Sequence, residues 1–361
     1  MKTIEIDTLT QIHALTSKMP NLLNDEDKAL LNQIYTEALE DLEDADSMFT
    51  YSITKAMRKH FENVQSKEHI YLQKFEIPQI RLFELLIQQF PLANLSQHCI
   101  NTLLANELAK HSNPVLMDIG IGTGMQVCTI IEQLIGNQNC QIKKLTIVGI
   151  EPYGEALKVT EQNINKISPN APFSIGLITK EAFIEKMALS EIQQLLPATY
   201  DGLYVNASFA LHHIQTAEDR KLVFETIKRL KVDAFALSEP NSDHYEKSYA
   251  QRFKNCVNHY GTLFKIIDTL VITNKEKAAL KLFFSREIDD VLGNTEDVRV
   301  EKHYATEQWI ELFEETGFTL EKKEAKFDYT TLNGTILQQN LSNRYSTAFE
   351  GEEITSLFWA K

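Results

Sequence analysis

The sequence predicts an α/β protein built on a mostly parallel, doubly wound sheet with large helical additions. Two observations carry this prediction. Apolar, strand-like runs alternate with helix-like runs after residue 111, which is the pattern of a parallel sheet with crossover helices. The first 110 residues contain no glycine and have the apolar spacing of helices. We therefore expect a helical N-terminal cap over residues 1–110, a sheet core over residues 111–241 and 300–361, and a helical cap insertion over residues 242–299.

Composition limits the partners that the chain can bind. Its 361 residues include 36 Lys and Arg against 50 Asp and Glu, a net charge of -14, which repels nucleic-acid backbones and anionic membranes. The four cysteines have no metal-binding spacing, so no metal site is predicted. No signal peptide or run of about 18 apolar residues is present. We expect a cytoplasmic protein without nucleic-acid or membrane partners. The sequence does not decide between a monomer and a homodimer.

One stretch combines a fold signal with a binding signal. Val115–Met117 is an apolar run that Asp118 ends, and glycines follow at 120, 122 and 124 before a helical pattern begins at Met125. Alternate glycines allow a tight turn and a close approach of the backbone to a ligand. Position 125 is not the third glycine of a dinucleotide fingerprint, and no Gly-Lys-Ser/Thr is present. The stretch predicts a nucleotide-binding loop of another kind.

Further strands are predicted after this loop. The run Leu145–Glu151 ends in a carboxylate that is suited to the hydroxyls of a ribose. Later strands are expected at 173–178, 202–206 and 234–238. We expect a strand after Phe318, then a polar loop, and a closing strand Ile354–Ala360 that pairs antiparallel with it at one edge. In the N-terminal region a helix is expected over Gln79–Gln89.

An acidic residue directly before Gly-x-Gly-x-Gly resembles motif I of the class I S-adenosylmethionine-dependent methyltransferases. This resemblance implies a Rossmann-like sheet with an antiparallel last strand, and S-adenosyl-L-methionine as cofactor. It places the cofactor on Asp118, Gly120, Gly122 and Gly124, with Glu151 at the ribose. The acidic residue that binds adenine in that family is not evident near Ile178–Lys180.

The chain from about residue 70 to its end is similar to the GRAS family. The stretch Val115–Gln126 resembles the family's Val-His-Ile-Ile-Asp motif with its following Gln, and Val205-Asn206 before Leu211-His212-His213 resembles its Leu-His-His block. Plant members are transcriptional regulators, whereas bacterial members resemble small-molecule methyltransferases. Because all three glycines are kept, the resemblance implies a bacterial-type member whose cofactor also meets Gln126 and Asn206. Weaker matches are Glu239, Asn241, Arg252-Phe253, Tyr260, Leu263-Phe264, Arg286–Ile288, Ser356 and Trp359.

These resemblances predict an S-adenosylmethionine-dependent methyltransferase that acts on a small molecule between the sheet and the cap. Methyl transfer needs alignment and one general base, so the catalytic candidates are His212, His213 and Glu239 after the fourth and fifth strands. Either histidine could instead cap a helix or pack, and Arg252 could hold a substrate anion or form a structural ion pair. The alternative is a non-catalytic GRAS-type regulatory or protein-interaction module. The substrate-binding candidates are Asn241, His244, Arg252 and Tyr260.

Overall fold

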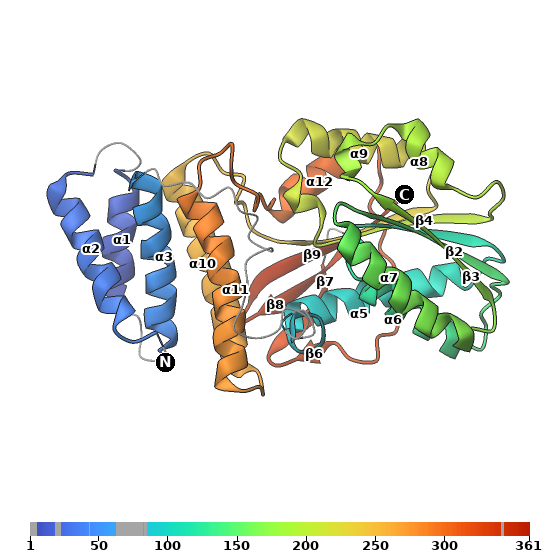
Figure 1. The fold of residues 1–361 in the computed structure, drawn as a ribbon, viewed down its shortest axis with the longest axis horizontal. Coiled ribbons are helices and arrows are strands. Elements are labelled where there is room, and N and C mark those ends of the chain that lie inside the picture. Colours follow the sequence, from blue (N-terminus) through green and yellow to red (C-terminus); the bar gives the residue numbers. More distant parts are fainter. Residues whose placement is uncertain (1–5, 19–22, 43, 63–81, 83–84, 341–342) are drawn as a thin grey trace.

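The computed structural model describes residues 6–18, 23–42, 44–62, 82, 85–340 and 343–361. Nine strands of this part form one sheet in the order β3-β2-β1-β4-β5-β9-β8-β7-β6 (Figure 1). The first five strands are parallel, and β9 runs antiparallel to β5. The mixed α/β class with a large sheet is therefore confirmed. The strands are β1 (Pro114–Ile119), β2 (Lys144–Glu151), β3 (Ser174–Glu181), β4 (Gly202–Ser208), β5 (Ala234–Pro240), β6 (Thr331–Leu332), β7 (Thr335–Asn340), β8 (Arg344–Phe349) and β9 (Glu352–Ala360).

Strands β1, β4 and β5 lie in the middle part of the sheet, and helices cover both of their faces. Every residue of β1 and of β5 is buried, as a parallel strand between two helical layers requires. On β1, Asp118 lies opposite Gly149 of β2 on one side and opposite Asn206 of β4 on the other. The register thus brings the predicted loop and the end of the fourth strand together at the carboxyl edge of the sheet.

Two layers of helices cover the sheet. Helices α5, α6 and α7 lie on one face, and α8, α9 and α12 lie on the other (Figure 1). Helix α5 falls within the range 1–110 expected as a cap, but its apolar side packs on α6 and the sheet. The bounds are α5 (Pro91–Leu108), α6 (Met125–Gly136), α7 (Gly154–Ile167), α8 (Leu189–Leu195), α9 (Ala217–Arg229) and α12 (Thr306–Glu315).

A separate group of helices stands at one end of the sheet (Figure 1). It joins the N-terminal helices to the insertion through one apolar core that includes Leu31, Ile53, Tyr260 and Ile288. Within the described part of the chain, no helix has the length and apolarity needed to cross a bilayer. The group consists of α1 (Ile6–Thr16), α2 (Asp25–Leu39), α3 (Ala45–Glu62), α10 (Tyr249–Thr269) and α11 (Asn274–Gly293).

Local capping explains where two of these helices begin. The Asn24 side chain accepts a hydrogen bond from the backbone N–H of Asp27 at 2.8 Å, and α2 starts there. Thr273 and Glu276 form a capping box that starts α11, so the insertion is two helices and not one. The helix expected over Gln79–Gln89 lies largely outside the described residues, and its last five residues form the π-helix Leu85–Gln89.

The C-terminal part differs from the prediction. The expected polar loop contains β6, β7 and β8, and the expected strand after Phe318 makes only one bridge, between Leu320 and Ala360. The edge strand is β6, and β9 lies inside the sheet. Asn333-Gly334 and Glu350-Gly351 have positive φ angles, which two-residue hairpin turns require, so the chain folds back twice.

Candidate functional site

The glycine loop connects β1 to α6 and has the backbone conformation that its glycines allow. Gly120, Gly122 and Gly124 have φ angles of 75°, 55° and 74°. A Cβ atom on Gly120 would lie 2.6 Å from the Ala210 Cβ, and one on Gly124 would lie 2.8 Å from the Thr160 Cγ2. A Cβ atom on Gly122 would meet nothing closer than 4.0 Å. The two outer glycines are therefore needed for packing, while the middle one faces open space.

A buried polar network stands beside this loop. The Asn206 Nδ2 donates to the Asp118 Oδ1 at 2.7 Å and lies 3.4 Å from the Gln126 Oε1. The Gln126 Nε2 donates to the Asn101 Oδ1 at 2.9 Å and to the Ser208 Oγ at 3.2 Å. The structure thus brings together three residues that the sequence analysis placed at the cofactor. Asn101 and Ser208 complete the network and were not among the predicted site residues.

Glu151 holds the loop from the end of β2. Its Oε2 accepts a hydrogen bond from the Gly122 N–H at 3.1 Å, and its Oε1 accepts one from the Tyr153 N–H at 3.3 Å. Burial raises the pKa of Glu151. Burial also raises the pKa of Asp118 to about 7, against the Asn206 hydrogen bond and with help from the Glu151 charge. Two desolvated carboxyl groups with raised pKa values thus border the loop.

Two of the three predicted catalytic residues, His212 and Glu239, are buried inside the protein, whereas the third, His213, is half-buried. Glu239 ends β5, and its Oε1 accepts hydrogen bonds from the Leu211 and Ala210 N–H groups at 2.7 and 3.1 Å. Its Oε2 lies 2.6 Å from the His212 Nδ1. His212 is 4% exposed and Glu239 is fully buried. Burial lowers the pKa of His212 well below its ordinary value and raises that of Glu239 to about 7.

Residues from the segment before α12 surround His212. The Glu301 Oε2 lies 3.5 Å from the His212 Nε2 and 3.1 Å from the His303 Nε2. The Glu301 Oε1 lies 3.7 Å from the Nδ1 of His213, which is half-buried. The sequence analysis named neither Glu301 nor His303, because they follow a long insertion and have no spacing that relates them to His212.

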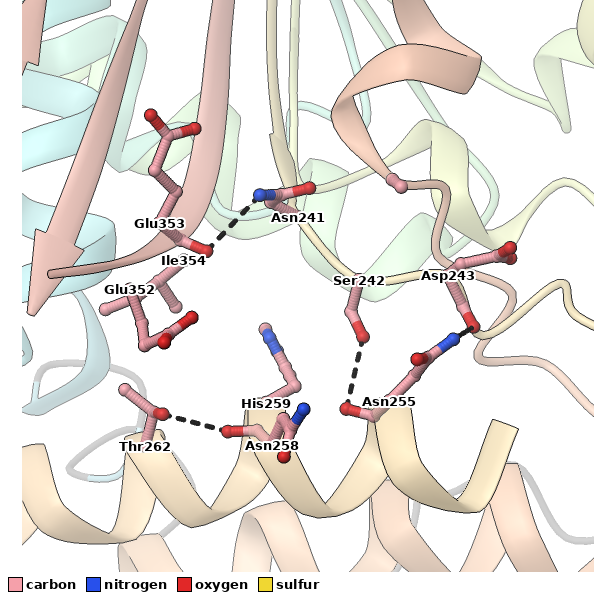
Figure 2. Close-up of a pocket in the computed structure, with 11 residues that line it drawn as sticks. Asn241, Ser242, Asp243, Asn255, Asn258, His259, Thr262, Glu352, Glu353 and Ile354 are labelled. Carbon is pink, nitrogen blue, oxygen red and sulfur yellow. Dashed lines mark hydrogen bonds between the residues drawn. The ribbon is translucent and has the colours of Figure 1, made fainter. Parts of the chain in front are cut away.

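A polar cavity of about 250 Å³ lies between α10 and the start of β9 (Figure 2). Of the predicted substrate residues, Asn241 lines it and His244 lies behind it. The His244 Nε2 lies 2.9 Å from the Ser242 Oγ, and its ring stacks on Tyr260. The residues that line the cavity are Asn241, Ser242, Asp243, Asn255, Asn258, His259, Thr262, Ala305, Glu352, Glu353 and Ile354.

Arg252 and Tyr260 also belong to α10, but neither residue lines the cavity. The Arg252 Nε donates to the Val291 carbonyl at 3.1 Å, and its Nη1 donates to the Glu246 carbonyl at 2.7 Å. Tyr260 is fully buried in the core of the helical group. The cavity instead faces residues spaced by three and four along α10, namely Asn255, Asn258, His259 and Thr262. Polar residues at this helical spacing were the available sequence signal.

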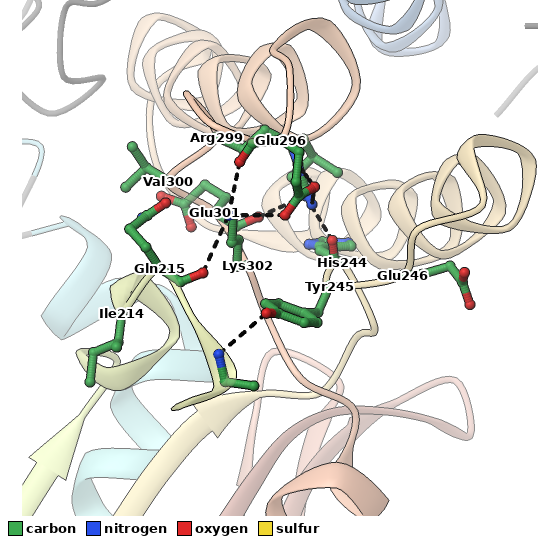
Figure 3. A network of polar contacts seen from close by, with 12 residues as sticks. Ile214, Gln215, His244, Tyr245, Glu246, Glu296, Arg299, Val300, Glu301 and Lys302 are labelled. Atoms are coloured by element: carbon green, nitrogen blue, oxygen red, sulfur yellow. Dashed lines mark hydrogen bonds and ion pairs between the residues drawn. The ribbon is translucent and has the colours of Figure 1, made fainter. Parts of the chain in front are cut away.

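A second polar network fixes the segment that carries Glu301 (Figure 3). The Arg299 Nη1 donates to the His244 carbonyl at 2.7 Å, and its Nη2 pairs with the Glu296 carboxylate. The Lys302 Nζ lies 2.9 Å from the other oxygen of Glu296. Arg299 is fully buried, so its hydrogen bonds hold this segment against the loop after β5.

The match to a family model decides the relationship of this chain to known proteins. The model of the GRAS domain family matches residues 10–361. The chain belongs to the GRAS family. The resemblance seen in the sequence is thereby confirmed at family level. The crystal structure of SCL7 from Oryza sativa superposes on 98% of this chain and 99% of that chain with a TM-score of 0.81 at 15% identity, which shows a shared fold.

Curated relatives of this GRAS chain are plant proteins. Scarecrow-like transcription factor PAT1 of Arabidopsis thaliana is 23% identical over 236 residues, which cover 61% of this chain and 46% of that protein. Scarecrow-like protein 34 of the same plant is 26% identical and covers 66% of this chain and 40% of its own length. DELLA protein GAI of Arabidopsis thaliana is 27% identical over 35% of this chain and 24% of its own length. This GRAS chain spans less than half the length of each of these relatives.

These comparisons overturn the prediction of a small-molecule methyltransferase. The relatives are GRAS proteins, one of them named as a transcription factor, and none of the three bears an enzyme name. The CurJ carbon methyltransferase reaches only a TM-score of 0.47 at 12% identity, over 99% of this chain and 80% of that chain. A likeness of that size carries no argument about activity. The motif I pattern reflects the strand and the glycine loop of this fold. Because a fold does not determine a function, the pattern does not establish methyl transfer.

Proposed function

We propose that this GRAS chain is a non-catalytic regulatory module that acts through contacts with other proteins. The observation that supports this is the burial of His212 and Glu239, which contact each other at 2.6 Å inside the fold. A general base must reach the proton that it removes. A histidine that is 4% exposed and already bonded to a structural carboxyl group is poorly placed for that task.

The relatives support the same proposal. PAT1 is named as a transcription factor, and this chain is similar to it over 61% of its own length. The chain spans under half of PAT1. We therefore propose regulation and partner binding for this chain and do not take them over from PAT1. The net charge of -14 favours protein partners over direct contact with nucleic acid.

We further propose that the glycine loop holds S-adenosyl-L-methionine as a ligand and not as a reactant. The loop fits such a group in two ways. Gly122 leaves open space beside a backbone turn, and Asp118 and Glu151 are buried carboxyl groups that accept hydrogen bonds from uncharged N–H groups. A cationic ligand with ribose hydroxyls would offset the desolvation of both acids. Asp118, Gly122 and Glu151 would hold it, supported by Gln126 and Asn206.

Three finer features belong to this proposal. The loop keeps all three glycines, which supports a bacterial-type member of the GRAS family that has retained its ligand. The helices α1–α3, α10 and α11 would serve as a cap over the carboxyl edge of the sheet. The location would be the cytoplasm.

Calorimetric titration with S-adenosylmethionine tests the ligand. We expect one molecule to bind per chain and to be recovered intact after incubation with pooled cellular metabolites, without S-adenosylhomocysteine. Asp118→Asn should weaken binding, whereas Asp201→Asn should not, because Asp201 lies at the opposite edge of the sheet and accepts the Ser112 and Asn113 N–H groups. Repeated turnover of the cofactor would overturn the non-catalytic reading, and absence of binding would overturn the ligand.

Protein partners need a separate measurement. Proximity labelling in the source cells nominates candidates, and each purified candidate is then mixed with the purified chain and examined by size-exclusion chromatography with light scattering. The proposal expects at least one stable binary complex that forms without methylation of the partner, as checked by intact mass. If no nominated protein forms a complex, the interaction module is refuted.

A further inference from the structure

Three metal-binding side chains meet in the buried space between the sheet and the helical group. His212 comes from the turn after β4, and Glu301 and His303 come from the segment between α11 and α12. One donor atom from each lies within 4.8 Å of the others, and all three residues are buried. We refer to His212, Glu301 and His303 as the His-Glu-His cluster.

The spacing of the cluster matches that of ligands around one ion. Two ligands of a tetrahedral Zn²⁺, each about 2.0–2.1 Å from the metal, lie about 3.3 Å apart. The Glu301 Oε2 is 3.1 Å from the His303 Nε2 and 3.5 Å from the His212 Nε2. The His213 Nδ1 lies 3.7 Å from the other oxygen of this carboxylate, the Glu301 Oε1.

Glu239 prepares His212 for this role. The Glu239 carboxyl group accepts two backbone N–H groups through Oε1, and its Oε2 faces the His212 Nδ1 at 2.6 Å. With Nδ1 donating to this oxygen, Nε2 is the nitrogen that carries the lone pair toward Glu301. A carboxylate that orients the far nitrogen of a ligating histidine is the usual support of a protein metal site.

Among the described residues, one buried arginine lies beside the cluster and directs its hydrogen bonds to backbone carbonyl groups. The guanidinium of this residue, Arg220, donates to the carbonyl oxygens of His212, Ile214 and Lys302. The guanidinium also lies over the face of Tyr304, whose ring centroid is 4.1 Å away.

We propose that the His-Glu-His cluster binds one divalent transition-metal ion of the zinc type. Imidazole and carboxylate donors suit Zn²⁺ better than Mg²⁺ or Ca²⁺, which prefer oxygen alone. The ion would tie the turn after β4 to the segment before α12 and so join the sheet to the helical group. This site is separate from the glycine loop, and the proposal does not depend on the function proposed above.

Titration of the metal-stripped full chain with Zn²⁺, and with Co²⁺ as a spectroscopic probe, tests the site. We expect one ion per chain, a visible Co²⁺ spectrum of low-symmetry coordination, and a higher melting temperature with Zn²⁺. Glu301→Gln and His303→Gln should abolish stoichiometric binding. Glu239→Gln should weaken it by about 10–100-fold, as loss of a supporting carboxylate does.

His259→Gln is the matched control. His259 is also buried and its ring lies 5.6 Å from that of His303, but it contributes no donor to the cluster. This variant should bind Zn²⁺ as the unaltered chain does. Should the ligand variants fail to fold, anomalous scattering from a Zn²⁺-soaked crystal of the unaltered chain still decides. A peak between His212, Glu301 and His303 supports the proposal, whereas a peak elsewhere or no stoichiometric binding overturns it.

Discussion

The side-chain amide of Asn206 donates a 2.7 Å hydrogen bond to the carboxyl group of Asp118 where β4 and β1 run side by side. Both side chains are buried, and the parallel register places them directly opposite each other. An acidic group that ends an apolar strand thus receives its partner from a strand almost ninety residues later in the chain. This pair joins the glycine loop to the centre of the sheet.

Removing the Asn206 amide should destabilise the protein. Asn206→Leu leaves the Asp118 carboxyl group buried without this donor, which costs about 1–3 kcal/mol. Urea denaturation at pH 7 measures the change in free energy of unfolding. Asn258→Ala provides the control, because Asn258 is exposed on α10. Equal stability of the two variants would mean that the buried pair contributes nothing.

The pH dependence of stability should reveal the buried acid. Burial raises the pKa of Asp118 from 3.8 to about 7, so between these values the folded protein holds a proton that the unfolded chain has lost. Stability attributable to Asp118 therefore falls as pH rises from about 4 to 7, by at most about 1.4 kcal/mol per pH unit, and is constant above. Subtracting the unfolding free energies of Asp118→Asn from those of the unaltered chain isolates this slope. A difference that rises with pH would contradict the assignment.

The three loop glycines should respond differently to alanine. Gly120→Ala and Gly124→Ala place a Cβ within 2.6 Å of Ala210 and 2.8 Å of Thr160, in addition to the strain of a positive φ. Gly122→Ala has open space around it and should lose only the conformational cost of about 1–2 kcal/mol. Melting temperatures should therefore drop least for Gly122→Ala. If this variant were the least stable, the packing roles of the loop would have to be reassigned.

Arg252 should stabilise the contact between α10 and α11. Arg252→Met keeps much of the apolar stem but removes the hydrogen bonds to the carbonyls of Val291 and Glu246. We expect the free energy of unfolding to fall by about 1–3 kcal/mol, because one buried and one partly buried carbonyl group lose a charged donor. Chemical denaturation gives the loss, and calorimetry should give unchanged S-adenosylmethionine affinity. Weaker S-adenosylmethionine binding at unchanged stability would contradict this structural role and would indicate that Arg252 contributes to ligand binding.

Parts of the fold were predictable because their signals are local. The runs that became β1, β2, β4 and β5 are short and apolar, and each ends close to where the sequence suggested. The strands β7 and β8 were missed because they are rich in Thr, Gln, Asn and Ser and sit near an edge, where alternation is weak. Asn333-Gly334 was the overlooked signal, since this dipeptide favours a two-residue hairpin.

The site was predictable only where its residues lie at the ends of recognisable strands. Asp118, Glu151, Asn206 and Glu239 all reach the carboxyl edge of the sheet as expected from parallel strands. The side of α10 that faces the cavity was missed although its polar residues recur at helical spacing, because polar residues also occur elsewhere around this helix and packing selects which of them line the cavity. Glu301 and His303 were missed because they follow a long insertion and have no spacing that relates them to His212.

By itself the sequence determined the family, the α/β class, the glycine loop and the acidic groups that border it, because backbone conformation and strand ends depend on neighbouring residues. The tertiary structure alone decided that His212 and Glu239 are sealed within the fold, and that Glu301 and His303 stand beside them. Burial and the meeting of distant side chains depend on how whole layers pack. Packing of the layers therefore decides whether His212 is a solvent-accessible catalytic base or part of a buried histidine cluster.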